Sequence, residues 1–480
     1  MSRAVTSVFM LEKQLDAMLA ARQTDEALRL IQDTVERILA EPICTAGVFA
    51  SALLDRYCQN VGAATLAVES LPSTKKGVCS VYIVTKLQKS GGHARALEDL
   101  IRAAPEGSTH VILSTELLGA SDRVVIENNL RDYNVTCEWN EDTAPSQKLR
   151  WLQTRVRALT PESVWLFNHH QDSVAVAAVQ PEQGYRAYYY HHGDHHLCLG
   201  VTLAYPTHID PLPMGFHHCR DELGIKENIY VPLWMKDGGE RPASCAFRKD
   251  GKITTCTAAK FNKVEVPYFI SYVEMIPAII QASGGRHVHI GALTPWALWR
   301  IKRGLKNKGI DVSRFVYTPW EPSVWQALHK YNVDLYIASF PIDGARTLIE
   351  AMGSGTPVAV HDHIATRMLS CADMVYPEAF VWRDPEALCG FLGSLSADFL
   401  NAQSQTARAF FLKQHDRALY QNIDIGRMHI MPPSPRLHKP DALQWGMDVT
   451  RHTTLFGVAW RFLYRHRRIL TGQISRLRRR

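Results

Sequence analysis

The chain has 480 residues, of which 46% are hydrophobic and 21% are charged. This composition excludes a small peptide, a fibrous repeat and a wholly disordered protein, and the length predicts two to four domains. The net charge is +7, but residues 461–480 hold eight arginines and no acid, which leaves the rest of the chain close to neutral. A neutral body with one basic tail argues against nucleic acid as a partner.

The ten cysteines are scattered with no CxxC pair, which is typical of reduced, mostly buried thiols. The first residues contain no apolar segment long enough for a signal sequence before Glu12 and Lys13 interrupt it. A run of about 18 apolar residues, as a membrane span requires, does not occur. We therefore expect a cytoplasmic protein.

The first part of the chain predicts helices and the next part predicts alternating strands and helices. Between Val8 and Val68 apolar residues recur at helical spacing, with no strand pattern between them. From Val78 onward, short apolar runs alternate with helical intervals, which is typical of βαβ units in a parallel sheet buried on both faces. The expected strands lie at 78–87, 110–115, 135–139, 163–168 and 185–190.

This alternation pauses over 191–240, a segment rich in His, Pro and Gly that we interpret as a linker. Asp250 and Gly251 then predict a hairpin turn. A second series follows, with strands expected at 287–291, 314–320, 333–339 and 357–361 and helices between them. The sequence thus predicts an α/β protein with a helical prefix (1–75), two Rossmann-like domains (76–240 and 241–400), and C-terminal helices with a basic tail (401–480).

The stretch 339–361 is the most informative about function. A strand is predicted to end at Phe340, a turn containing Gly344 follows, and a helix is expected to start near Ala345. The free backbone N–H groups and the positive dipole end of such a helix point at whatever lies above the strand ends. This geometry suits a diphosphate, although a βα turn without a ligand would have the same pattern.

Three side chains of this helix are candidate binding residues. Arg346 and Thr347 in the first turn offer a charged fork and a hydroxyl to phosphate oxygens. Glu350 lies one turn further along the same face and is placed to accept hydrogen bonds from ribose hydroxyls.

This stretch resembles the donor domain of GT-B glycosyltransferases. The shared features are the turn glycine Gly344, Thr347, the acid Glu350, and Gly-Thr-Pro at 355–357 leading into a strand. Glu350 occupies the second acid position of the glycosyltransferase family four motif, whereas Ile342 occupies the first. The spacing is more similar to that of O-GlcNAc-transferase-like and bacterial cytoplasmic adhesin glycosyltransferases.

A second stretch, 256–267, resembles the same enzymes at the first strand of the donor domain. The resemblance implies that Lys263 pairs with the donor diphosphate, with Lys260 as a competing candidate for this role. Such a lysine stabilises the departing nucleoside diphosphate as negative charge builds on it. Arg346 departs from the pattern, which has a threonine at that position.

Two loops complete the expected donor and acceptor surfaces. In GT-B donor domains the loop that corresponds to 316–322 packs against the nucleobase, and Trp320 is placed either to stack on the base or simply to pack. In the first domain, Gly91, Gly92 and His93 follow the first strand and resemble the acceptor-side loop of this fold. A plain βα turn is the alternative interpretation.

A histidine cluster offers a different kind of site. Nine of the 21 histidines fall between His169 and His218, and 191–196 reads His-His-Gly-Asp-His-His. Within the GT-B interpretation this segment faces the cleft between the domains, where His192 or Asp194 can act as general base on an acceptor hydroxyl. A histidine-rich loop satisfied by backbone carbonyls and a metal site similar to that of metallo-β-lactamase-type hydrolases are the alternatives.

We expect a metal-independent glycosyltransferase without a cofactor, acting on a nucleoside diphosphate sugar such as a UDP-sugar. The expected acceptor is a glycan, a lipid-linked glycan or a protein, in bacterial surface glycan or glycoprotein biosynthesis. The tail 455–480 alternates apolar residues with arginines and, if helical, suits peripheral binding to the anionic inner face of the membrane. Nucleic acid as the partner of the tail and a solvated, frayed chain end are the competing interpretations. The alternatives are a His/Asp-dependent metallohydrolase and a non-catalytic GT-B-like binding subunit.

Overall fold

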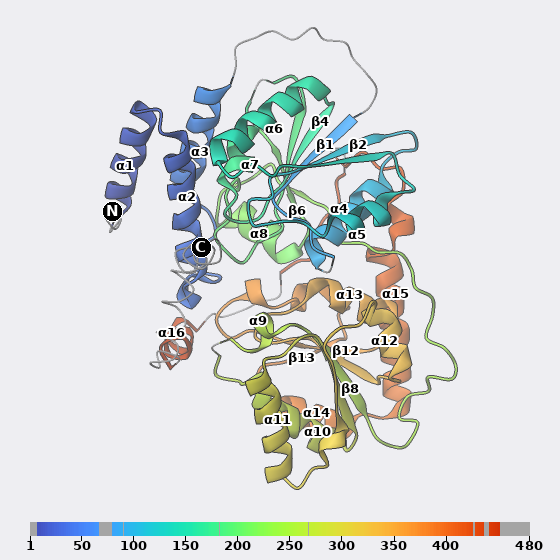
Figure 1. Ribbon diagram of the computed structural model, residues 1–480. Coiled ribbons are helices and arrows are strands. Elements are labelled where there is room, and N and C mark those ends of the chain that lie inside the picture. Colours follow the sequence, from blue (N-terminus) through green and yellow to red (C-terminus); the bar gives the residue numbers. More distant parts are fainter. Residues whose placement is uncertain are drawn as a thin grey trace, which may run out of the picture.

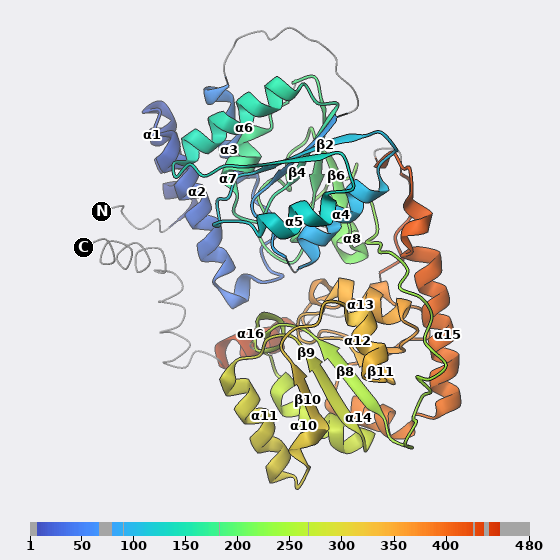
Figure 2. The ribbon, with the colours of Figure 1, turned by 45° about the vertical axis from the view of Figure 1, so that its right-hand side comes forward.

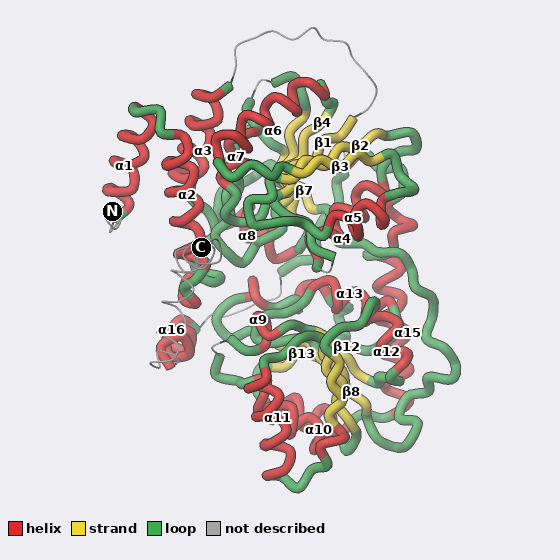
Figure 3. The backbone as a smooth tube through the Cα atoms, viewed as in Figure 1, coloured by secondary structure: helices red, strands yellow, loops and turns green. Residues whose placement is uncertain are grey.

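The computed structural model describes residues 7–66, 79–89, 91–181, 183–266, 268–425, 428–435 and 441–451. Within these ranges the strands form two parallel sheets, of seven and six strands. Figure 1 shows the two sheets in separate domains, one above the other, and Figure 3 shows that each sheet has helices around it. The predicted α/β class and the two Rossmann-like domains are therefore confirmed.

The first sheet has the strand order β3-β2-β1-β4-β5-β6-β7. Its strands are β1 (Cys79–Val84), β2 (Thr109–Ser114), β3 (Val135–Trp139), β4 (Ser163–Phe167), β5 (Arg186–Tyr190), β6 (Thr207–Asp210) and β7 (Ile229–Tyr230). Its helices are α4 (Gly92–Ala103), α5 (Arg123–Leu130), α6 (Pro145–Leu159), α7 (Ser173–Ala178) and α8 (Pro213–Asp221).

Both faces of this sheet are buried, which explains the continuous apolar run of β1. Because side chains alternate along a strand, Val81 and Ile83 point to one face and Tyr82 and Val84 to the other. The first pair packs in one core cluster with α6 and α7, and the second pair packs in another cluster with α4 and α5.

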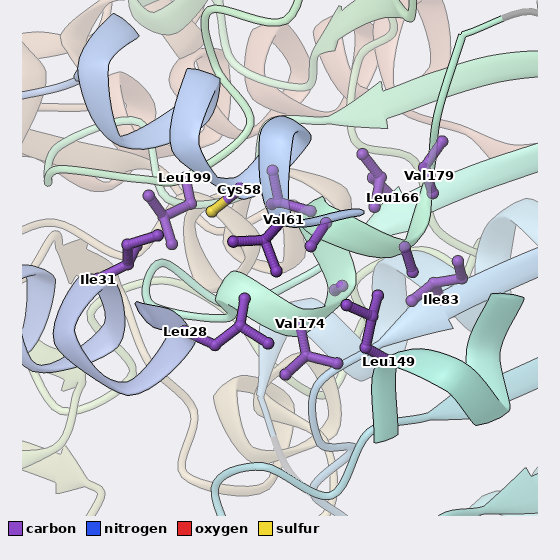
Figure 4. Packing of buried hydrophobic residues seen from close by; sticks show 14 of the residues in the cluster. Leu28, Ile31, Cys58, Val61, Ile83, Leu149, Leu166, Val174, Val179 and Leu199 are labelled. Atoms are coloured by element: carbon purple, nitrogen blue, oxygen red, sulfur yellow. The ribbon is translucent and has the colours of Figure 1, made fainter. Parts of the chain in front are cut away.

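The helical prefix consists of α1 (Val8–Ala20), α2 (Thr24–Leu39) and α3 (Ala52–Thr65). Leu28 and Ile31, one turn apart on α2, are fully buried and join the core of the first domain (Figure 4). Helix α3 approaches α7 closely at Gly62, where an added Cβ would lie 1.9 Å from the carbonyl oxygen of Ala177. The prefix is therefore an integral layer of the first domain.

The segment 191–240 is not a linker, which corrects the prediction. It contains β6, α8 and β7, and β6 pairs in parallel with β5 to extend the first sheet. The sequence concealed these elements because β6 is a four-residue strand with three polar residues and β7 has only two residues. The predicted hairpin is also wrong, since Asp250 and Gly251 lie in a turn before β8 (Thr254–Ala258), which pairs in parallel with its neighbours.

The second sheet has the order β10-β9-β8-β11-β12-β13. Its further strands are β9 (Arg286–Ile290), β10 (Phe315–Thr318), β11 (Leu335–Ile337), β12 (Val358–His361) and β13 (Phe380–Trp382). The accompanying helices are α9 (Phe261–Val264), α10 (Tyr272–Ser283), α11 (Pro295–Asn307), α12 (Val324–Lys330), α13 (Ala345–Gly353) and α14 (Pro385–Ser394).

After the second sheet the chain returns to the first domain. Helix α15 (Ala397–Gln414) runs along the second domain, as Figures 1 and 2 show. Beyond it, the ring of Tyr420 stacks on Trp234 in a core cluster of the first domain. A final helix, α16 (Ala442–Arg451), ends the described part, and the predicted membrane-binding tail 455–480 lies outside it. Among the described helices, none has the length and apolarity needed to cross a membrane.

Candidate functional site

A cavity of about 730 Å³ lies between the two domains. From the first domain it is lined by Gly91, Gly92 and Arg95, at the start of α4. From the second domain it is lined by the loop after β10 and by one face of α13. In parallel α/β sheets, ligands bind at the carboxyl ends of the strands, and these loops and helix starts follow such ends.

The turn before α13 is held together by a lysine from α9. Lys263 Nζ donates a hydrogen bond of 2.5 Å to the backbone carbonyl of Asp343. The Asp343 carboxylate accepts from the backbone N–H of Gly344 at 2.5 Å, and burial raises the pKa of Asp343 to about 6. The hydroxyl of Thr347 donates to the Gly344 carbonyl and accepts from the hydroxyl of Tyr336, both at 2.9 Å. The helix begins at Ala345 as predicted.

Arg346 lines the cavity but is paired across it. Its guanidinium lies 2.8 Å from the carboxylate of Asp99 on α4, and both side chains are largely buried. Burial raises the pKa of Asp99 above its ordinary value, although Arg346 and Arg102 oppose this shift. The pair joins the two domains through the wall of the cavity.

Glu350 and Trp320 occupy the part of the cavity beside α12. The Glu350 carboxylate accepts a hydrogen bond of 2.9 Å from the backbone N–H of Trp325 at the start of α12. Burial raises the pKa of Glu350. Trp320 lies in the loop after β10 and is 59% exposed, so its ring is available for stacking.

The loop after β1 brings the glycine pair against the histidine-rich segment. Gly91 has a φ of +139°, a conformation that favours glycine, and α4 begins at Gly92. An added Cβ at Gly92 would lie 3.7 Å from the imidazole of His192. His93 is buried beneath this contact, and its ring lies against those of Phe167 and His192.

The 191–196 segment carries an aspartate–histidine pair. The Asp194 carboxylate lies 3.3 Å from Nδ1 of His195, whose side chain is 30% exposed. Burial raises the pKa of Asp194 to about 7 and lowers the pKa of His195 to about 4. Burial also lowers the pKa of His192 to about 3, with a smaller contribution from Lys263 of the other domain. At neutral pH both imidazoles are therefore uncharged.

Gly193 allows this segment to pack closely. An added Cβ at Gly193 would lie 2.1 Å from Nε2 of His170, a distance that no side chain tolerates. Gly215 on α8 similarly leaves room for the Asp194 carboxylate, since a Cβ there would lie 2.8 Å from Oδ2. The carboxylate of Asp194 thus faces α8, and His195 covers it from the other side.

The cavity has an excess of positive charge, because in the described part of the chain seven basic and four acidic side chains line it. Such an excess attracts an anionic ligand. The basic side chains are those of Lys89, Arg95, Arg102, Lys236, Lys260, Arg346 and Arg417, and the acidic ones are those of Asp99, Asp132, Glu321 and Glu350.

No protein-family model matches the chain, and no curated protein matches its sequence. Its backbone is similar to that of Anabaena Alr3699/HepE in complex with UDP and glucose, with a TM-score of 0.53 and 13% sequence identity over 72% of this chain and 97% of that chain. It is also similar to a glycosyltransferase from Rickettsia africae, with a TM-score of 0.54 and 12% identity over 72% of this chain and 96% of that chain. The chain has the GT-B fold.

Around the GT-B interdomain cavity the structure brings together seven residues that the sequence singled out: Gly91, Gly92, Lys260, Trp320, Arg346, Thr347 and Glu350. Lys263 lies beside the same turn, and His192 lies against the glycine loop. Asp194 is buried behind His195.

Sequence reasoning missed two features of the site. His195 was not considered as the partner of Asp194, although the two are adjacent in the chain. The face of α4 that carries Arg95, Asp99 and Arg102 lines the cavity, which was not predicted. Their i, i+4, i+7 spacing places the three on one helix face, which was the available signal.

Proposed function

We propose that this chain is a glycosyltransferase that moves a sugar from a nucleoside diphosphate sugar to an acceptor hydroxyl. The observation that carries the proposal is the basic cavity between two GT-B domains, with the start of α13 on one side and the glycine loop on the other. Anabaena Alr3699/HepE, which shares the fold, has been crystallised with UDP and with UDP-glucose. A UDP-sugar is therefore the first donor to test.

On the donor side, the diphosphate lies at the start of α13. Lys263, Arg346 and the free backbone N–H groups supply positive charge there, and Thr347 contributes a hydroxyl. Lys263 then shifts from the Asp343 carbonyl toward the phosphates. Glu350 accepts hydrogen bonds from the ribose, and Trp320 stacks on the base.

On the acceptor side, the 191–196 segment supplies the general base. The acceptor oxygen attacks the anomeric carbon, the bond from this carbon to the diphosphate oxygen breaks, and the acceptor proton passes to the base. His192 is one candidate, because it lies against Gly92 as a neutral imidazole. The Asp194–His195 pair is the other, with the carboxylate orienting the imidazole as in a catalytic triad.

In this proposal the transfer step needs no metal ion and no cofactor, because Lys263, Arg346 and the helix dipole neutralise the leaving diphosphate. The acceptor is a glycan, a lipid-linked glycan or a protein in bacterial surface glycan or glycoprotein biosynthesis. The enzyme acts in the cytoplasm, with 455–480 holding it at the inner face of the membrane. The basic and apolar pattern of this tail supports that location.

The test combines binding with turnover. EDTA-treated protein is titrated with UDP, GDP, ADP, CMP and dTDP in a thermal-shift assay, where a ligand at 100 times its Kd adds about 2.7 kcal/mol of stability. Release of the nucleotide from the matching sugar donor, with and without candidate acceptors, is then measured. No shift with any nucleotide would refute the donor site.

Lys263→Ala sharpens the test, and Lys260→Ala is the comparison because Lys260 directly precedes α9, lines the cavity and is the competing candidate for the same role. Loss of one preorganised donor typically lowers turnover by about 10² to 10³. We expect this loss for Lys263→Ala and a much smaller one for Lys260→Ala. Equal turnover by Lys263→Ala and the unmodified protein would contradict the role.

A non-catalytic nucleotide-sugar-binding subunit is the second candidate, favoured by one observation. Arg346, the expected phosphate ligand, is paired with Asp99 across the cavity. Such a subunit would show the thermal shift without nucleotide release in the presence of any acceptor.

A further inference from the structure

Four potential metal ligands converge inside the first domain, away from the donor cavity. They are His191 after β5, His208 and Asp210 on β6, and Cys219 on α8. All four residues are buried, and one ligand atom from each lies within 4.8 Å of the other three. Their sequence positions span only 29 residues, but the sheet and α8 are needed to bring them together.

Four of the six separations between these atoms lie close to the edges of a metal coordination tetrahedron, and all six are within 4.8 Å. Asp210 Oδ1 lies 3.0 Å from His191 Nδ1, 3.2 Å from His208 Nε2 and 3.4 Å from Cys219 Sγ. Cys219 Sγ also lies 3.4 Å from His191 Nδ1. Zinc bound to nitrogen, oxygen and sulfur at ordinary bond lengths requires edges of about 3.3–3.6 Å, so small shifts would admit an ion.

The surroundings of the cluster fit a bound cation. Asp210 is fully buried, and its ion-pair partners among the described residues are the imidazoles of His191 and His208. Its second oxygen, Oδ2, accepts a hydrogen bond of 2.7 Å from Asn228, whose amide also donates to the Phe216 carbonyl at 2.9 Å. An outer hydrogen bond of this kind orients a metal-binding carboxylate.

We propose that His191, His208, Asp210 and Cys219 bind a structural zinc ion. Two imidazoles, a thiolate and a carboxylate form a four-coordinate set of the kind that zinc prefers. With four protein ligands and full burial, the site has no open position for water, so its role is structural and not hydrolytic.

The ion would connect the ends of β5 and β6 to α8. His191 immediately precedes the segment with His192 and the Asp194–His195 pair, so the metal fixes where that segment leaves the sheet. The inference does not depend on the glycosyltransferase proposal.

The experiment measures metal on full-length protein purified with a non-histidine tag. After incubation with Zn²⁺ and removal of unbound ion, mass spectrometry of the metal should give about one zinc per chain. Replacement by Co²⁺ should produce a thiolate-to-cobalt charge-transfer absorption. Cys219→Ser should lose this absorption and most of the zinc. Cys198→Ser is the matched control because Cys198 is also buried in the same domain but lies outside the cluster.

A further variant keeps the inference testable if Cys219→Ser does not fold, as judged by circular dichroism. Asn228→Ala keeps all four ligands but removes the outer hydrogen bond to the carboxylate, together with the contacts of Asn228 to Phe216 and Arg220. Zinc affinity in competition with a chelator should fall by about 10- to 100-fold. Unchanged affinity would contradict the assigned arrangement. Less than about 0.1 zinc per chain in the unmodified protein, with no cobalt absorption, would overturn the proposal, as would full zinc retention by folded Cys219→Ser.

Discussion

Glu350→Gln tests the proposed ribose contact with a minimal change. The Glu350 carboxylate lines the cavity and accepts the backbone N–H of Trp325 at 2.9 Å. Glutamine has the same length and keeps one acceptor oxygen, so it preserves this contact at the start of α12. The substitution removes only the negative charge presented to the ligand.

The expected loss follows from the difference between charged and neutral hydrogen bonds. A hydrogen bond to a charged group contributes about 1.5–3 kcal/mol, and a neutral one contributes about 0.5–1.5 kcal/mol. The substitution should therefore cost about 1–1.5 kcal/mol of binding free energy, which corresponds to a UDP affinity about five- to tenfold weaker. Stability should change little because both the packing and the Trp325 contact remain.

Isothermal titration calorimetry with UDP, 2′-deoxy-UDP and 3′-deoxy-UDP at pH 7.5 measures this effect. The control is Glu321→Gln, which lines the same cavity but whose carboxylate is held by Lys330 at 2.8 Å and Tyr331 at 2.9 Å. UDP affinity should change by less than about twofold in the control, as for a surface pair.

The deoxy ligands show whether Glu350 contacts the ribose. If it does, the losses of binding free energy caused by removing the charge and by removing the contacted hydroxyl will be less than additive for one of the two deoxy ligands. The reasoning is refuted if folded Glu350→Gln binds UDP as tightly as the unmodified protein. It is also refuted if the losses are fully additive for both deoxy ligands.

Three further predictions concern the cross-domain pair, the histidine-rich segment and a buried carboxyl group. Asp99→Asn should free Arg346 for the phosphates and tighten UDP binding by up to about fivefold, because one ion pair contributes about 1 kcal/mol. Calorimetry measures this affinity, and weaker UDP binding by the folded variant would contradict the competition between Asp99 and the phosphates for Arg346. Gly193→Ala places a Cβ 2.1 Å from the imidazole of His170 and should lower the free energy of unfolding, measured in urea, by about 1–3 kcal/mol. The control is Gly390→Ala, which has open space around it on a helix and should not destabilise the protein. Burial raises the pKa of Asp343 from 3.8 to about 6, so its neutral form stabilises the fold at low pH and this contribution is lost as pH rises through about 6. Between pH 4.5 and 7.5 the free energy of unfolding of Asp343→Asn should therefore rise by about 2 kcal/mol relative to that of the unmodified protein. If the two proteins show parallel curves of unfolding free energy against pH, the carboxyl group is not buried as described.

Local patterns in the chain were enough to predict the two α/β domains and the start of α13. Apolar runs such as 163–168 are long enough to indicate a strand that is buried on both faces, and the Gly344 turn marks where the next helix begins. These features depend on neighbouring residues, so they can be read along the sequence.

Strands β6 and β7 could not be predicted in the same way. They are short, and β6 carries His208 and Asp210 in place of apolar residues. Pairing with β5 stabilises them as strands, and that pairing exists only once the sheet has formed.

The partners of the charged side chains were likewise decided by the tertiary structure. Arg346 lines the cavity, and its pairing with Asp99, 247 positions earlier in the chain, depends on how the two domains face each other. The four-residue cluster around Asp210 arises because parallel strand ends and α8 converge on one side of the sheet. Residue spacing along one strand or helix follows from backbone geometry, whereas contacts between elements depend on packing that no local pattern encodes.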